Sequence, residues 1–133
     1  MTTIIDKVAL LCVRDRRVLL ARSRGRSAWY LPGGKREPDE SDEAALAREI
    51  REELAVELVP GSLIHAAEFT ARADGHGDGT LVRSHGWFAR LDGEPTPSAE
   101  IEEIAWVSHR DRDPCSQTAR LVLEYLHAAG LID

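Results

Sequence analysis

Three glutamates are the residues of this chain best suited to chemistry, because Glu49, Glu52 and Glu53 stand at positions i, i+3 and i+4. On a helix this spacing projects the three carboxylates from one side. Clustered carboxylates are the hard oxygen ligands that Mg²⁺ prefers, and Mg²⁺ commonly bridges protein carboxylates and substrate phosphates. The spacing therefore predicts a magnesium site. The alternative is a solvated acidic face, in which Arg48 and Arg51 relieve the repulsion between the carboxylates.

The loop in front of these glutamates favours the metal site. It reads Leu31-Pro-Gly-Gly-Lys-Arg-Glu-Pro-Asp-Glu40 and leads directly into the helix. Gly33 and Gly34 permit a tight backbone turn and the close approach of a ligand or a metal ion. Their carbonyl oxygens are therefore candidate additional ligands.

Loop and helix together resemble the sequence box of the Nudix hydrolase family. That box is Gly, five residues, Glu, seven residues, then Arg-Glu-apolar-any-Glu-Glu-any-Gly-apolar. This chain matches it at Gly34, Glu40, Arg48, Glu49, Ile50, Glu52, Glu53 and Val56. Two positions depart from the pattern, since Ala55 replaces the later glycine and Asp39 replaces a usual glycine before the first glutamate. Because alanine tolerates a left-handed backbone poorly, we expect none at the helix end, and we expect Asp39 to reshape the loop.

The resemblance implies a hydrolase that uses Mg²⁺ or Mn²⁺. It assigns the metal ligands to Glu49, Glu52 and Glu53, with Glu52 and Glu53 ranked first, and adds the carbonyl of Gly33. Arg48 would orient the helix glutamates through ion pairs and not contact the substrate. Bound metal ions would neutralise a diphosphate and lower the pKa of a bound water.

The general base is left open, because in this family it is sometimes a box glutamate and sometimes a glutamate on a later loop. Glu100 and Glu103 stand just before a predicted strand, where relatives often carry acids ahead of a tryptophan. An acidic strand entrance that serves only solubility is the alternative. For Glu40 we favour pairing with Arg48 over a direct catalytic role.

Residues that would bind the substrate are harder to identify. Lys35 is a candidate phosphate contact, or a surface lysine. Trp29 and Tyr30 could stack on a base or pack in the core. Arg22 could hold phosphates or be plain surface charge. The histidines show no metal-ligand spacing, and only His76, in a glycine-rich loop expected over 74–79, is set apart.

The substrate class follows by elimination. Downstream of the box the chain lacks the patterns of ADP-ribose pyrophosphatases and dinucleoside polyphosphate hydrolases, and upstream it lacks that of coenzyme A pyrophosphatases. What remains resembles the MutT group, which cleaves nucleoside triphosphates, including oxidised ones, to monophosphate and pyrophosphate. Three alternatives stay open: a hydrolase of ADP-ribose or a dinucleotide, a non-catalytic nucleotide-binding module, and a structural domain whose acidic helix is only surface.

The composition limits the classes of partner that this chain is expected to bind. The chain has 133 residues and a formal charge of −6, without a long basic run, which argues against binding a long nucleic acid. It has neither an apolar run of membrane-spanning length nor a signal-peptide pattern, so we expect no membrane and a cytoplasmic location. We expect one domain over 1–133, a small nucleotide as the partner, and leave a homodimer open.

The elements that position these residues can be located from the apolar pattern. We expect strands at 8–13, 18–22, 29–31, 80–91 and 103–107, extended segments at 56–58 and 63–70, and a stop at 32–34. Ser41 should cap a helix that ends near Leu54, with Leu46, Ala47 and Ile50 on its core face. A second helix should cover 116–129. This order predicts an α/β (α+β) fold, an α/β/α sandwich with a mixed central sheet.

Overall fold

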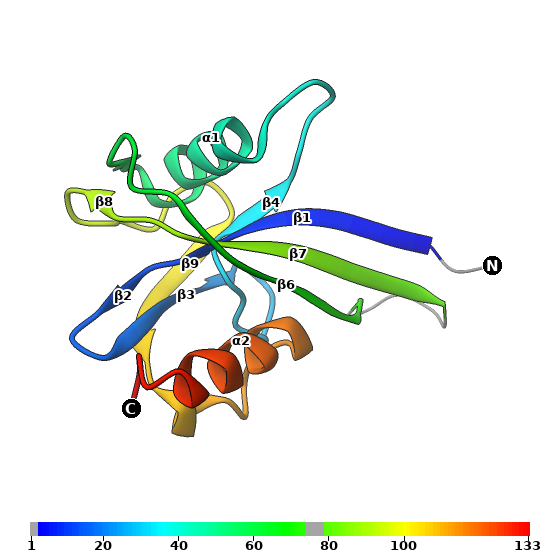
Figure 1. Cartoon of the computed structure of the whole chain (residues 1–133), viewed down its shortest axis with the longest axis vertical. Helices are drawn as coiled ribbons and strands as arrows, with labels where there is room; N and C mark the ends of the chain where they lie inside the picture. Colours follow the sequence, from blue (N-terminus) through cyan, green and yellow to red (C-terminus); the bar gives the residue numbers. More distant parts are fainter. Residues whose placement is uncertain (1–2, 74–78) are drawn as a thin grey trace.

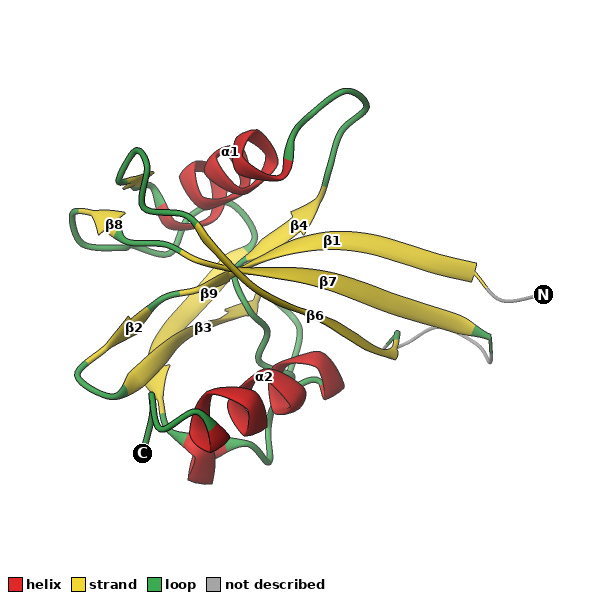
Figure 2. Cartoon of the chain, viewed as in Figure 1, coloured by secondary structure: helices red, strands yellow, loops and turns green. Residues whose placement is uncertain are grey.

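The structure is a computed structural model and describes residues 3–73 and 79–133. Two helices, α1 (Asp42–Leu54) and α2 (Gln117–Ala128), lie on opposite sides of the strands, α1 at the top and α2 at the bottom of the view (Figure 1). Figure 2 shows the strands as the middle layer of this sandwich. The predicted α/β/α arrangement is confirmed.

The strands form a mixed central sheet and two smaller groups. The central sheet has the order β4-β1-β7-β6, and β1 runs parallel to β7 and antiparallel to β4. A second sheet has the order β2-β3-β9, and β5 pairs with β8. The strands are β1 (Thr3–Leu11), β2 (Val13–Arg14), β3 (Arg17–Ser23), β4 (Gly33–Lys35), β5 (Glu57–Leu58), β6 (Ile64–Arg72), β7 (Thr80–Phe88), β8 (Leu91–Asp92) and β9 (Ile101–Val107). A short 3-10 helix, η1 (His109–Asp111), precedes α2.

Two apolar clusters hold the layers together. On one side of the sheet Leu46 and Ile50 of α1 pack with Leu10 of β1, and all three are fully buried. On the other side Leu123 of α2 packs with Leu11, the next residue of β1. Because both faces of β1 are covered at its second half, residues 8–11 form a continuous apolar run and not an alternating one.

Local signals in the sequence locate both helix starts. The hydroxyl of Ser41 accepts a 3.1 Å hydrogen bond from the N–H of Ala44 and caps α1 as predicted. The hydroxyl of Ser116 accepts the equivalent bond from Ala119 at the start of α2. The predicted end of α1 at Leu54 is also confirmed.

The strand expected over 29–31 is wrong. Trp29 and Tyr30 make only isolated bridges, to Cys115 and Ala21, and the strand lies slightly later, at the glycines read as a stop. The reason is steric: a Cβ at Gly33 would lie 2.1 Å from the carbonyl oxygen of Val8. These glycines let β4 approach β1 closely. The segment expected over 80–91 also divides into β7 and β8.

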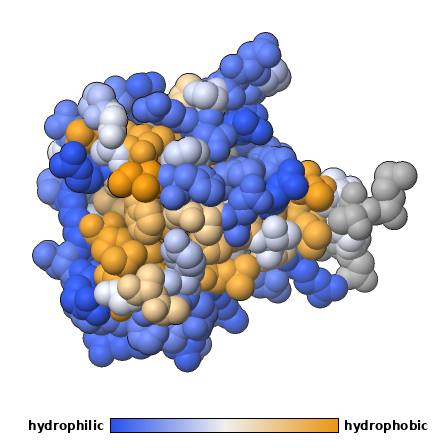
Figure 3. Space-filling view, in the orientation of Figure 1, coloured by the Kyte–Doolittle hydropathy of each residue, from blue (hydrophilic) through white to orange (hydrophobic). Residues whose placement is uncertain are grey.

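The surface is polar over both helices and more apolar between them, as Figure 3 shows. Ile64, at the start of the edge strand β6, is 66% exposed. The homodimer left open by the sequence stays a prediction. Among the described residues, no helix is both long and apolar enough to cross a membrane.

His76 and most of the predicted glycine-rich loop lie outside the described residues.

Candidate active site

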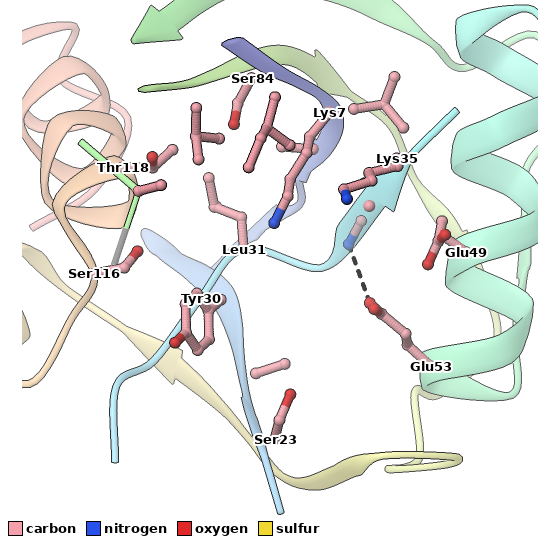
Figure 4. Close-up of a pocket in the computed structure, with 18 of the residues that line it drawn as sticks. Lys7, Ser23, Tyr30, Leu31, Lys35, Glu49, Glu53, Ser84, Ser116 and Thr118 are labelled. Carbon is pink, nitrogen blue, oxygen red and sulfur yellow. Dashed lines mark hydrogen bonds between the residues drawn. The ribbon is translucent and has the colours of Figure 1, made fainter. Parts of the chain in front are cut away.

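Acidic side chains from two parts of the chain line one end of a cavity of about 460 Å³. Glu49 and Glu53 reach it from α1, and Glu100 reaches it from the loop before β9. Glu53 is 7% exposed, and its Oε1 accepts a 3.0 Å hydrogen bond from the N–H of Gly33 (Figure 4). The helix α1 and the glycine segment at the start of β4 therefore meet at the buried carboxylate of Glu53.

Burial makes this carboxylate hard to ionise. Desolvation, together with the charges of Glu49 and Glu100, raises the pKa of Glu53 to about 8 although the Gly33 N–H opposes the shift. Desolvation also raises the pKa of Glu49, against the opposing effect of Arg48. Buried carboxylate oxygens crowded in this way are the donor set that a hard divalent cation compensates. In the chemistry of their donor atoms, the residues present therefore fit Mg²⁺ or Mn²⁺.

The side chains do not yet converge on one point. Among residues 3–73 and 79–133, no three His, Cys, Asp or Glu side chains are grouped so that they could hold a metal ion. Glu49 is turned toward Arg48, whose Nη1 lies 3.0 Å from its Oε1, and Glu53 is turned toward Gly33. Metal binding would require these carboxylates to rotate.

Gly34 leaves the space that the carboxylate of Glu49 occupies. A Cβ at Gly34 would lie 2.7 Å from the carboxyl carbon of Glu49, closer than real contacts allow. A side chain at this position would push the carboxylate away from β4. The glycine is therefore required by the packing of Glu49, a predicted metal ligand.

Arg48 ties the loop to the helix. Its guanidinium donates two hydrogen bonds of 2.8 Å to Glu40 and one of 3.0 Å to Glu49, so the predicted ion pairs are present. It also donates to the carbonyl of Lys35 at 3.1 Å. The bonds from Arg48, with one from the N–H of Glu37, lower the pKa of Glu40 to about 2. Glu40 thus forms the expected pair with Arg48, and its rank below the catalytic residues stays a prediction.

Glu52 lies apart from its two neighbours. Its side chain is 55% exposed, and its Oε1 lies 3.7 Å from Arg48. In the described part of the chain the cavity lining includes Glu49 and Glu53 but not Glu52. The i, i+3, i+4 spacing placed three carboxylates on one side of the helix, and the sheet brings two of them into the cavity.

The expectation drawn from Ala55 is wrong. Ala55 has φ 53° and ψ 37°, a left-handed conformation, and its N–H donates to the carbonyl of Arg51 at 3.1 Å. The chain must reverse here to bury Val56, and this tertiary requirement overrides the poor tolerance of alanine for such a backbone. Asp39 also has a positive φ, 68°, which aspartate tolerates better than alanine.

The loop that carries Glu100 is fastened to the end of α1. The N–H of Ser98 donates to the carbonyl of Glu53, and the N–H of Thr96 donates to that of Leu54, both at 2.9 Å. These bonds satisfy terminal carbonyls of the helix. They also hold Glu100 beside the helix glutamates.

The other predicted residues divide between the cavity and its surroundings. Lys35 and Tyr30 line the cavity, whereas Arg22, Trp29 and Glu103 are not among the described residues that line it. Arg22 forms ion pairs with Glu102 and Glu103 and lies over the ring of Trp29.

Sequence reasoning missed several residues that line the rest of the cavity. Lys7 and Ser84 lie on its floor, and Ser116 and Thr118 stand at the start of α2 (Figure 4). One signal for Lys7 was available, since it is a charged residue directly in front of a fully apolar run.

Known proteins with similar sequences and structures support one family. The model of the NUDIX domain matches residues 5–124. CTP pyrophosphohydrolase of Escherichia coli (strain K12) is 33% identical over 108 residues, covering 78% of this chain and 76% of the relative. The solution structure of the E. coli ORF135 protein has a TM-score of 0.75 and 30% identity over 99% of this chain and 96% of that one. The MutT NUDIX hydrolase from Burkholderia pseudomallei has a TM-score of 0.76 and 27% identity over 92% and 97% of the two chains.

Proposed function

This chain belongs to the Nudix hydrolase family, and on that premise we propose that it hydrolyses a nucleoside triphosphate, with CTP the first candidate, to monophosphate and pyrophosphate. Membership makes it a pyrophosphohydrolase of nucleoside diphosphate derivatives. The choice of CTP follows the name of the E. coli relative, and the proposal treats residues 1–133 as one catalytic domain. Oxidised triphosphates belong in the same test.

The observation that carries the proposal is the environment of Glu53. A carboxylate that is 7% exposed and shares one end of a cavity with two other carboxylates is costly to maintain without a compensating cation. A surface acidic helix would expose this side chain to water. The burial of Glu53 therefore favours a site for a cation and its phosphate ligand over the solvated-face alternative.

Each residue has a distinct proposed task. Glu49 and Glu53, with the carbonyl of Gly33 and with Glu52 at the edge, would hold the divalent ion. When bound, Mg²⁺ neutralises phosphate charge and lowers the pKa of the attacking water. The carboxylate of Glu100 accepts the proton of that water as the new oxygen–phosphorus bond forms and the bond to the leaving pyrophosphate breaks. Lys35 contacts the phosphates.

The supporting residues keep this arrangement in place. Arg48 holds Glu49 through its guanidinium and fixes the loop through Glu40. Tyr30 lines the cavity opposite α1 and would contact the nucleoside (Figure 4).

The test is pyrophosphate and phosphate release from a nucleotide panel with Mg²⁺ and with Mn²⁺. The panel holds the common triphosphates, an oxidised triphosphate, ADP-ribose, a dinucleoside polyphosphate and NADH. Glu53→Gln should abolish release. Glu43→Gln is the matched control, because Glu43 is an exposed glutamate in the first turn of the same helix.

The outcomes separate the alternatives. CTP converted to CMP and pyrophosphate, with loss only in Glu53→Gln, supports the proposal. Cleavage of ADP-ribose or a dinucleotide alone overturns the substrate and keeps the chemistry. Metal-dependent binding of nucleotides without release of any product would identify a binding module.

A further inference from the structure

Three polar residues form a row across the floor of the cavity. In the central sheet Lys7 of β1 is in register with Lys35 of β4 on one side and with Ser84 of β7 on the other. Residues in register on neighbouring strands send their side chains to the same face of a sheet. All three line the cavity, and Figure 4 shows both lysines directed into it.

The row is bounded by apolar or glycine positions on both sides. Two residues after Lys7 on β1, Ala9 is in register with Gly33 of β4 and with Gly86 of β7. Two residues from Lys7 in the other direction, Ile5 stands beside Val82. Polar side chains are thus confined to one line of an otherwise apolar floor, and that line begins beside the glutamates of α1.

Neither lysine forms an ion pair in the described part of the chain. Like charges directly opposite each other on a sheet are destabilising. Among residues 3–73 and 79–133, no carboxylate lies within 4.0 Å of the ammonium group of Lys7 or Lys35. Partial burial and the charge of Lys35 lower the pKa of Lys7, whereas the more distant Glu53 and Glu49 raise it. An anion bound between the two ammonium groups would relieve this repulsion.

Ser84 adds a hydroxyl group to the row, and this hydroxyl can donate a hydrogen bond to a ligand. It is 3% exposed, and its hydroxyl makes no hydrogen bond to any described residue, although it is accessible from the cavity. Buried polar groups are nearly always hydrogen-bonded. A hydroxyl in this position indicates that the ligand supplies the partner.

We propose that Lys7 is a phosphate-binding residue. With Lys35 it forms a two-lysine clamp on the phosphate chain of the substrate, and Ser84 donates the next hydrogen bond in the row. The strands are about 4.8 Å apart, so successive donors are spaced to meet different oxygens of one polyphosphate. This inference rests on the proposed function, because it assigns the recognition of the phosphate chain within the same site.

The experiment measures binding of inorganic tripolyphosphate to the full chain by titration calorimetry with Mg²⁺. In parallel, KM and kcat are measured with CTP. Lys7→Met keeps the apolar stem and removes the charge, and Lys7→Gln is a second variant in case the first folds poorly. Lys7→Arg tests rescue by a cation. Arg17→Met is the control, because Arg17 is an exposed cation of β3 outside the cavity.

We expect Lys7→Met and Lys7→Gln to weaken tripolyphosphate binding by about tenfold to a hundredfold, the size of one lost charge-assisted hydrogen bond. KM for CTP should rise more than kcat falls. Lys7→Arg should recover part of the affinity, Ser84→Ala should show a smaller loss, and Arg17→Met should match the wild type.

Wild-type affinity for tripolyphosphate in both Lys7 variants overturns the inference. If those variants instead lose discrimination among CTP, UTP and ATP, Lys7 contacts a base carbonyl and the phosphate assignment is wrong. A wild type that binds tripolyphosphate through Lys7 but hydrolyses no nucleotide contradicts the proposed function alone. Normal CTP turnover in the Lys7 variants contradicts the inference alone.

Discussion

The backbone N–H of Gly33 donates a 3.0 Å hydrogen bond to Oε1 of Glu53, and this bond joins the start of β4 to the most buried carboxylate of α1. One hydrogen bond does not offset burial beside Glu49 and Glu100, so the pKa of Glu53 rises from 4.5 to about 8. The site is therefore under electrostatic stress when no cation is bound. That stress can be measured.

The first prediction concerns the pH dependence of stability in EDTA. Between the unfolded pKa of 4.5 and the folded pKa of about 8, native Glu53 keeps a proton that the unfolded chain has released. Stability falls with rising pH wherever the native state binds more protons. The free energy of unfolding should therefore decrease from about pH 5 to pH 8 by a few kcal/mol, since each pKa unit is worth about 1.4 kcal/mol. Urea unfolding at several pH values measures the slope.

Two controls bear on this result. Glu53→Gln cannot ionise, so its stability should vary much less over the same pH range. Saturating Mg²⁺ should stabilise the wild type more at pH 8 than at pH 5, because the ion binds the ionised form. Equal slopes for wild type and Glu53→Gln would show that Glu53 ionises normally.

The second prediction concerns Gly34→Ala. The new methyl group would meet the end of the Glu49 side chain at 2.7 Å, and that flexible side chain can move aside. We expect a small change in melting temperature but a loss of about a hundredfold or more in kcat/KM, because a misplaced group in an active site is costly. Calorimetry and steady-state kinetics on the same preparation test both parts. A folded variant with wild-type activity would show that Glu49 need not occupy its present position.

The third prediction concerns the left-handed residue at the end of α1. Ala55 has φ 53°, where an alanine is strained by about 1–2 kcal/mol and a glycine is not. Part of that gain is lost to the greater flexibility of glycine in the unfolded chain. We expect Ala55→Gly to raise the free energy of unfolding by roughly 0.5–1 kcal/mol, measured by urea denaturation.

The matched control is Ala44→Gly, an exposed position in the first turn of the same helix. There the same change should destabilise the protein by about 0.5–1 kcal/mol. If both variants lose stability, the strain inferred at Ala55 is absent.

Residues with local signals were predictable from the sequence. Ser41 and the apolar stripe through Leu46 and Ile50 are sufficient to locate α1, because a cap and a 3.6-residue period act within one helix. The ion pair of Arg48 with Glu40 followed from the family resemblance in one short segment. These features depend little on the rest of the chain.

Features set by tertiary structure were not predictable in the same way. Lys7 and Ser84 lie far apart in the sequence and become neighbours only through the parallel register of β1 with β7. The conformation of Ala55 is imposed by the turn into β5, against the preference of the residue. The glycines of β4 looked like a stop because their role is close approach to Val8, a partner that the local sequence does not reveal.

The last prediction compares the two candidate bases that follow the helix glutamates in sequence, Glu100 and Glu103. Glu100 lines the cavity, and its loop is fastened to the carbonyls of Glu53 and Leu54. Glu103 pairs with Arg22, outside the described cavity lining. We expect Glu100→Gln to lower kcat by about a hundredfold or more, in the range for loss of a general base, and to flatten the acidic limb of the pH–rate profile. Glu103→Gln should leave kcat within a few fold of the wild type and keep that limb. The reverse pattern would place the base on β9 itself and would require the strand to turn Glu103 away from Arg22 when substrate binds.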